Sequence, residues 1–302
     1  MLLDICIVGA PKCATSSLFE WLTAHPCIEG PCSDKELFFF MDEAHPLIAG
    51  INAHNSSLDD YRSLFPDGDD KLLIEATTHY LYQRNALERL AKVKSPPLLI
   101  AIVRDPAERV LSSFQYTKNN LARIDQDVLF SDYVRWYFDR EWARIAEAVE
   151  QGGSRYVVMR DILFSEYIRF LDPYRKNVSR GDLIVVTFGE VVRKPEKVCK
   201  KIVKKVGADP DFYGTYNYPV ENPTYKIRSR ILHQWARRLN NVVPEGKIKE
   251  FMKTGYRKAM MQSRRERKAD GKESALRRLG EHFRPYNRRL SETFGIDVRG
   301  WW

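Results

Sequence analysis

The chain has 302 residues, and 44% of them are hydrophobic, which is enough for a sizeable buried core. Its 49 lysines and arginines exceed its 40 acidic residues, and the formal charge of +9 favours anionic ligands without requiring one. Five irregularly spaced cysteines argue against a disulfide framework or a zinc site, and favour a reducing, cytoplasmic compartment. No uninterrupted apolar stretch reaches the roughly 18 residues of a membrane span, so we expect a soluble protein.

Short apolar runs and helical segments alternate along the chain. Runs rich in Ile, Leu and Val predict buried strands at residues 4–8, 72–76, 98–103 and 183–188. Helices are predicted at residues 15–24, 85–92, 106–120, 131–151, 162–174 and 194–206. This alternation predicts an α/β fold, in which helices cover both faces of a central parallel sheet.

The C-terminal part of the chain differs in composition from the rest. From residue 225 onward no strand is predicted, and residues 261–290 contain ten Lys/Arg and four Asp/Glu. We predict a single domain over residues 1–302, with an α/β core at 1–220 and a mainly helical, arginine-rich extension at 221–302. A solvated helical face explains its charge more simply than a nucleic-acid or polysaccharide surface.

The first predicted strand leads into the sequence GAPKCATSSLFEWL, residues 9–22. A loop between a strand and a helix offers backbone N–H groups and a helix N-terminus to an anion, and Lys12 adds a positive charge. Hydroxyl groups of Thr15, Ser16 and Ser17 follow. A magnesium-dependent kinase places a hydroxyl directly after the lysine, and this chain does not. The loop therefore predicts a phosphate-like ligand without a metal.

A second candidate anion site lies in the sequence LLIAIVRDPAERVLSSFQY from Leu98. Arg104 follows a buried strand, Asp105 can cap the next helix, and Pro106 suits its first position. Ser112, two turns along, could bind an anion held by Arg104. The alternative is that Arg104 and Asp105 only form a salt bridge at the helix cap. Two such strand ends in one parallel sheet predict a nucleotide that lies across its carboxyl edge.

These two motifs resemble those of sulfotransferases that use 3′-phosphoadenosine 5′-phosphosulfate (PAPS). Residues 9–18 resemble the loop for the 5′-phosphosulfate, and residues 104–112 resemble the 3′-phosphate motif. Two further sequences, KELFFF at 35–40 and EATTHY at 75–80, are similar to the heparan sulfate branch and its bacterial relatives. The resemblance implies a three-layer, P-loop-type fold, with PAPS as donor and adenosine 3′,5′-bisphosphate as product.

The resemblance also implies which residues form the site. Glu36 corresponds to the family's general base, and an adjacent apolar wall at residues 38–40 would raise its pKa; a surface ion pair with Lys35 is the alternative. His79 is the second candidate acid or base. The cofactor-binding residues are Pro11, Lys12, Cys13, Ala14, Thr15, Ser16, Ser17, Arg104, Ser112 and Arg228.

Departures from the family pattern occur at two positions. Ala14 stands where the family usually has glycine, and Ala76 stands where the heparan sulfate branch often has lysine. The second change leaves glycosaminoglycan recognition in doubt. The segment NPTYKIRSR at residues 222–230 is expected to close over the nucleotide.

The predicted function is transfer of a sulfuryl group from PAPS to a hydroxyl of a carbohydrate or a small natural product, without a metal. The partner is then a hydroxylated acceptor, and we expect neither nucleic acid nor a membrane span. Two alternatives stay open from the residues alone: a P-loop kinase of a small hydroxylated compound, and a non-catalytic polyanion-binding protein.

Overall fold

A computed structural model describes residues 3–48, 50–68, 70–93, 95–179, 181–219 and 271–301. The described chain divides into two compact units. The first contains the described residues within 1–109, 161–219 and 279–301, and the second contains the described residues 110–160 and 271–278. The predicted closing segment with Arg228 lies outside the described residues.

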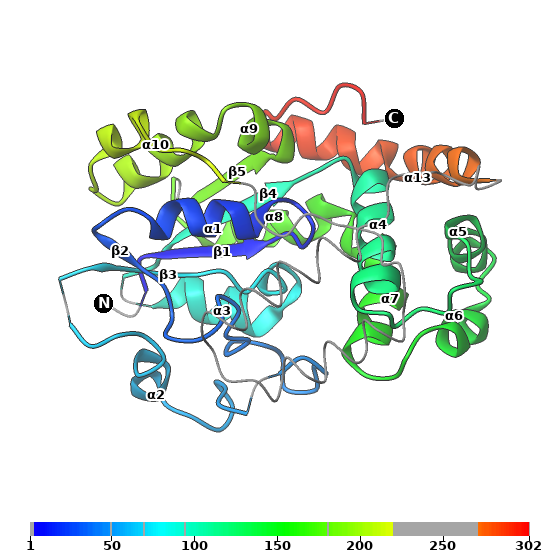
Figure 1. The fold of residues 1–302 in the computed structure, drawn as a ribbon, viewed down its shortest axis with the longest axis horizontal. Helices are drawn as coiled ribbons and strands as arrows, with labels where there is room; N and C mark the ends of the chain where they lie inside the picture. Colours follow the sequence, from blue (N-terminus) through cyan, green and yellow to red (C-terminus); the bar gives the residue numbers. More distant parts are fainter. Residues whose placement is uncertain are drawn as a thin grey trace, which may run out of the picture. The chain divides into compact units, whose positions relative to one another are not determined.

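The first unit is built on a five-stranded sheet with the order β2-β3-β1-β4-β5 (Figure 1). The strands are β1 (Ile5–Gly9), β2 (Ile28–Glu29), β3 (Leu72–Glu75), β4 (Leu98–Val103) and β5 (Leu183–Thr187). Every neighbouring pair is parallel. Strands β1 and β4 are fully buried, as expected for continuous apolar strands between two helical layers. The predicted α/β fold with a parallel sheet is confirmed, and only the two-residue β2 was not foreseen.

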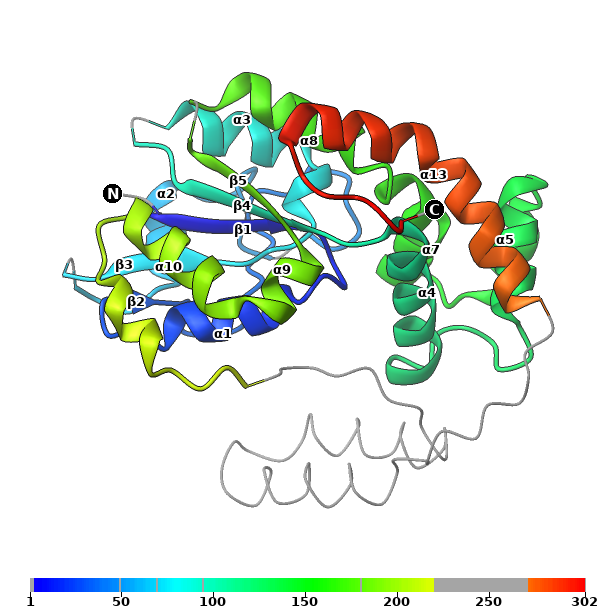
Figure 2. The ribbon, with the colours of Figure 1, turned by 90° about the horizontal axis from the view of Figure 1, so that it is seen from above.

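Helices cover both faces of this sheet (Figure 2). One layer contains α1 (Thr15–Thr23), α9 (Phe188–Arg193) and α10 (Pro195–Lys205), and the other contains α3 (Arg84–Lys92) and α8 (Tyr167–Asn177). Short helical segments α2 (Leu58–Arg62), η1 (Tyr80–Tyr82) and η3 (Pro210–Gly214) complete the unit. Because parallel strands end at the same edge, the residues after β1, β3 and β4 lie near one another.

Three predicted helices have other boundaries in the structure. The helix predicted at 106–120 is α4 (Pro106–Gln115) followed by the π-helical turn η2 (Tyr116–Asn120). The single helix predicted at 131–151 is wrong, because α5 (Phe130–Phe138) and α6 (Trp142–Ala148) are separated by Arg140, whose φ is +60°. The helix predicted at 162–174 is interrupted between α7 (Gly153–Phe164) and α8, where the Ser165 and Glu166 amides make turn hydrogen bonds.

The arginine-rich C-terminal segment contains the predicted helix, α13 (Lys272–Phe294). In the first unit, its His282 Nε2 lies 3.0 Å from Oε1 of the buried Glu166, and Arg169 also pairs with Glu166. This contact fixes the end of the chain beside the start of α8. Within the described residues, no helix is both long and apolar enough to cross a bilayer.

Gly9, the last residue of β1, has no room for a side chain. A Cβ atom there would lie 2.9 Å from both the Thr78 carbonyl oxygen and the Leu81 Cβ. We therefore expect Gly9→Ala to lower the free energy of unfolding by about 1–3 kcal/mol, as overpacking does in buried sites. Urea unfolding measures this. Gly214→Ala, whose Cβ would meet only Lys200 at 3.8 Å, is the control and should change stability far less.

Candidate functional site

The loop between β1 and α1 has an unusual backbone, and the N-terminus of α1 follows it directly. Lys12 and Ala14 adopt positive φ angles of 68° and 66°, in the left-handed region. Ala14 is the N-cap of α1 and provides no side-chain cap, so the first N–H groups of the helix have no capping side chain. At its other end the loop is held to β4, because the Ala10 N–H donates to the Ile102 carbonyl over 3.0 Å. This is the arrangement of an anion-binding loop.

Ala14 is the position at which the family usually has glycine. The left-handed conformation found there costs alanine about 1–2 kcal/mol relative to its ordinary conformations, whereas glycine adopts it freely. The backbone shape that glycine would give is therefore retained, at a cost in strain.

Lys12 carries the loop's positive charge in partly buried surroundings. Burial lowers the pKa of Lys12 to about 8, and the nearby cations Arg104 and Lys35 act in the same direction, whereas Cys13 and Asp161 oppose it. The interactions with Arg104 and Lys35 place three cationic side chains, from three separate segments, around one region. Such a cluster is electrostatically unfavourable until an anion enters it.

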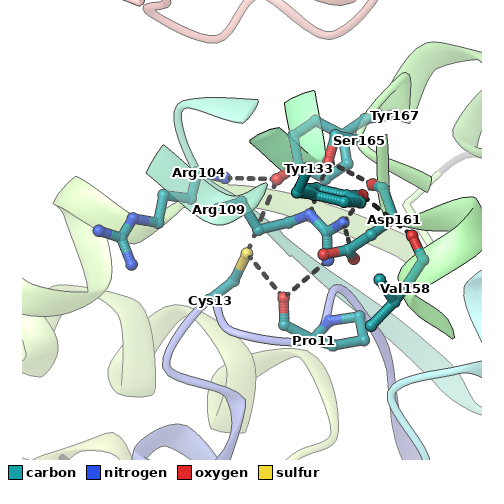
Figure 3. A network of polar contacts seen from close by, with 9 residues as sticks. All are labelled: Pro11, Cys13, Arg104, Arg109, Tyr133, Val158, Asp161, Ser165 and Tyr167. Atoms are coloured by element: carbon teal, nitrogen blue, oxygen red, sulfur yellow. Dashed lines mark hydrogen bonds and ion pairs between the residues drawn. The ribbon is translucent and has the colours of Figure 1, made fainter. Parts of the chain in front are cut away.

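Beneath the loop, Arg109 is a buried side chain that joins three segments (Figure 3). Its guanidinium pairs with the Asp161 carboxylate in the last turn of α7, and Nε donates to the Ser165 hydroxyl over 2.9 Å. Nη1 reaches the Pro11 carbonyl of the loop at 3.5 Å. Arg109 thus supports the loop through Pro11, while Asp161 neutralises the charge of Arg109.

Cys13 lies in the same cluster and is chemically quiet. Its thiol is buried, within 3.8 Å of the Tyr167 hydroxyl, and burial raises the pKa of Cys13 to about 11. The Tyr167 hydroxyl also accepts from the Arg104 N–H at 3.4 Å. Cys13 therefore acts in the loop as a packed side chain rather than as a nucleophile.

Arg104 directly follows β4, as predicted, and its side chain is partly exposed. Asp105 caps α4 by accepting from the Ala107 N–H at 2.9 Å, and the ion pair of Arg104 is with Glu108 at 3.5 Å, not with Asp105. The guanidinium lies 4.8 Å from the ring centre of Phe188, the first residue of α9. The alternative of a simple Arg104–Asp105 salt bridge is therefore not what the structure has.

Glu36 lies beside the cations, but its pKa is not raised as the sequence suggested. Burial raises the pKa of Glu36, while Lys35 at 3.7 Å and the hydrogen bonds from Thr78 lower it below its usual value. The Thr78 hydroxyl and N–H donate to Oε1 over 2.6 and 3.1 Å. Two of the three residues of the expected apolar wall, Phe39 and Phe40, are instead buried in the core against Tyr61, and Phe38 is half-buried.

His79 is buried close to Glu36. Burial lowers the pKa of His79 to about 4, although the negative charge of Glu36 opposes this. Its ring contacts those of His45, Tyr82 and Phe164, and its Nδ1 has no hydrogen-bond partner among the described residues. The imidazole is therefore neutral at pH 7.

The structure brings most of the predicted residues together. Thr15 and Ser17 are buried in the first turn of α1, and Ser16 is half-buried. Ser112 lies on α4 in the part assigned to the second unit. Sequence reasoning missed Asp161, Ser165, Tyr167 and Phe188. Only Arg109, already inside the RDPxxR pattern, could have signalled a need for a buried acidic partner.

Comparison with known proteins identifies the family of this chain. The family model described as "Sulfotransferase domain" matches residues 2–216. The chain is 22% identical to mouse heparan sulfate glucosamine 3-O-sulfotransferase 3A1 over 98% of its own length and 63% of the relative's. It is 30% identical to the membrane-associated sulfotransferase kil1 of Dictyostelium discoideum over 50% of its length and 30% of that protein's.

Solved structures show the same fold. A sulfotransferase from Alicyclobacillus acidocaldarius superposes with a TM-score of 0.65 at 19% identity, covering 99% of this chain and 98% of the other. The protein belongs to the sulfotransferase family. The chain spans less than two thirds of the length of the mouse 3-O-sulfotransferases it resembles.

The lowered pKa of Lys12 predicts how activity responds to pH. Lys12 is protonated below about pH 8 and loses its charge above it, so kcat/KM for the donor nucleotide should fall as pH rises through about 8. In Lys12→Arg the charge persists, so this alkaline limb should disappear even though the rate is lower. A parent profile that stays flat between about pH 7 and 9.5 would contradict the assignment.

Removing the buried charge of Arg109 should destabilise the protein strongly. Arg109→Met leaves the Asp161 carboxylate buried without its cation, which costs about 3–5 kcal/mol in comparable pairs. The double variant Arg109→Met/Asp161→Leu should recover much of that loss. Chemical denaturation of the single and double variants measures the difference, and equal stability of both would show that the pair is not the cause.

Proposed function

We propose that this protein transfers a sulfuryl group from PAPS to a hydroxyl group of a carbohydrate or small molecule. The observation that carries the proposal is the convergence of Lys12, Arg104 and Lys35 beside the Glu36 carboxylate. Family membership supports it, and the missing hydroxyl directly after Lys12 disfavours the kinase alternative.

The residues fit a nucleotide with an anionic group at each end. The uncapped start of α1 and the Lys12 ammonium suit the 5′-phosphosulfate. Arg104 suits a 3′-phosphate, and its contact with the face of Phe188 orients the guanidinium. We include Ser112 in the 3′-phosphate site on the resemblance of its motif, and Arg228 among the cofactor-binding residues.

Lys12 and Glu36 have separate roles in the proposed transfer. When bound, the nucleotide supplies an activated sulfuryl group, whose bond to the bridging oxygen breaks as a new sulfur–oxygen bond forms to the acceptor. Lys12 stabilises the negative charge that remains on the bridging oxygen and the 5′-phosphate. Glu36 accepts the proton of the acceptor hydroxyl.

Glu36 is the better candidate for this base than His79. Its carboxylate is partly exposed, with 28% of the side chain accessible, whereas His79 is 8% exposed and is enclosed by aromatic rings. Direct contact with the acceptor's proton is required of a general base. His79 can still influence Glu36, because the two groups interact electrostatically.

The acceptor and the compartment are further parts of the proposal. The mouse relatives act on heparan sulfate glucosamine by name, which favours a sugar hydroxyl here. Ala76 lacks the positive charge that this branch often has, which disfavours a highly sulfated chain. All five cysteines are free thiols, consistent with a reducing, cytoplasmic compartment.

Calorimetric titration tests the donor site. Adenosine 3′,5′-bisphosphate should bind in the micromolar range without metal, and ATP with magnesium should bind much more weakly. Arg104→Ala should weaken bisphosphate binding about tenfold or more, because it removes a charge-assisted contact. Arg175→Ala, which removes an exposed cation paired with Asp172, is the control and should bind like the parent. Binding of ATP with magnesium, without binding of adenosine 3′,5′-bisphosphate, would support the kinase alternative.

A further inference from the structure

Glu75, the last residue of β3, is a fully buried carboxyl group with several hydroxyl partners. The Tyr61 hydroxyl of α2 donates to its Oε2, and the Thr77 hydroxyl donates to its Oε1. The Tyr80 hydroxyl and the Leu37 backbone also lie close enough to interact with the carboxyl group. None of the chemistry assigned above uses this group, although a buried carboxyl group is costly to maintain.

The partners of Glu75 hold the backbone of the segment that contains Glu36. The Phe38 N–H donates to the Thr77 hydroxyl, and the Phe40 N–H donates to the Tyr80 hydroxyl, both over 3.1 Å. The Thr77 hydroxyl thus links Glu75 to the Phe38 N–H, and the Phe40 N–H is held by Tyr80, whose hydroxyl also interacts with Glu75.

The two ends of this arrangement explain why Glu36 has a fixed place. On the preceding side, the Lys35 carbonyl accepts from the Ala76 N–H at 2.9 Å. On the following side, the Phe38 N–H donates to the Thr77 hydroxyl, which in turn donates to Glu75. Glu36 lies between these anchors, and its carboxylate accepts both hydrogen bonds from Thr78.

We propose that Glu75 is a positioning residue that fixes the segment 35–40 and thereby places the Glu36 carboxylate for proton abstraction. The proposal rests on the proposed sulfuryl transfer for its functional consequence. Its structural part, the fixing of the segment, stands on the hydrogen bonds alone.

A carboxyl group suits this role better than its amide. Burial raises the pKa of Glu75, and the hydroxyl donors of Thr77 and Tyr61 act against this because they stabilise the carboxylate. A carboxylate only accepts, and its two oxygens have room for about four donors. Glutamine in the same place would present an NH₂ group to hydroxyls that already donate, so at least one of them must turn away. Because the Thr77 hydroxyl also accepts from the Phe38 N–H, a turned Thr77 loosens the backbone directly.

The test compares Glu75→Gln with Glu166→Gln. Glu166 is another buried carboxylate of the same unit, held by Arg169 and His282 and unconnected to residues 35–40 by any hydrogen bond described. We expect amide hydrogen exchange of residues 35–40 to be about tenfold or more faster in Glu75→Gln and unchanged in Glu166→Gln. Turnover with a sugar-alcohol acceptor that the parent sulfates should fall on the order of 10–100-fold in Glu75→Gln alone.

The affinity for adenosine 3′,5′-bisphosphate distinguishes positioning from a general loss of structure. It should stay within about twofold of the parent in Glu75→Gln, because the groups assigned to the two anionic ends of the donor, Lys12 with the start of α1 and Arg104, belong to other segments. Lys35 keeps its own backbone bond to Ala76. If Glu75→Gln does not fold, Thr77→Val removes the link to Phe38, and Thr77→Ser, which keeps the hydroxyl, should retain parent behaviour.

Unchanged exchange of residues 35–40, or equal loss of turnover and of bisphosphate affinity, would overturn the role of Glu75. A parent chain that binds the bisphosphate but transfers no sulfuryl group would instead argue against the proposed function. The exchange measurement would still decide whether Glu75 fixes the segment, so the two failures are distinguishable.

Discussion

The burial of one positive charge organises the loop after β1 and the segments packed beneath it. Arg109 is enclosed with the Asp161 carboxylate, and its remaining donors go to the Ser165 hydroxyl and to backbone oxygens of Pro11 and Asp161. An unpaired charge in that place would be prohibitive, so the last turn of α7, the start of α4 and the loop must assemble together. The loop can then keep its left-handed residues, because the supporting contacts outweigh their strain.

The site places side chains of like charge near one another. Lys12, Arg104 and Lys35 repel one another, and the lowered pKa of Lys12 reflects both its burial and that repulsion. Glu36 partly offsets the charge through its pair with Lys35. Such a site is electrostatically prepared for an anion, because the positive charges are already in place and need not be reorganised when the anion binds.

Much of the fold was predictable from the sequence, because the four apolar strands and the helices between them have continuous or periodic patterns. The RDPxxR segment also placed Arg104 and the Asp105 cap correctly. The surroundings of Glu36 were not predictable, since its pKa depends on Thr78, which is 42 residues away in the chain. The same holds for Asp161, whose position inside a helix gives no local sign that it faces Arg109. The three phenylalanines at 38–40 suggested an apolar wall beside Glu36, but two of them, Phe39 and Phe40, are part of the core.

The order of the strands separates the two halves of the reaction in the chain. Under the proposed function, the donor is held by segments that follow β1 and β4, whereas the base belongs to the long connection between β2 and β3. A lineage could therefore lengthen or replace the parts of that connection beyond Lys35 and Glu36, and so exchange one acceptor for another, without disturbing the binding of the donor. The parallel sheet makes acceptor choice and donor use separately inheritable traits.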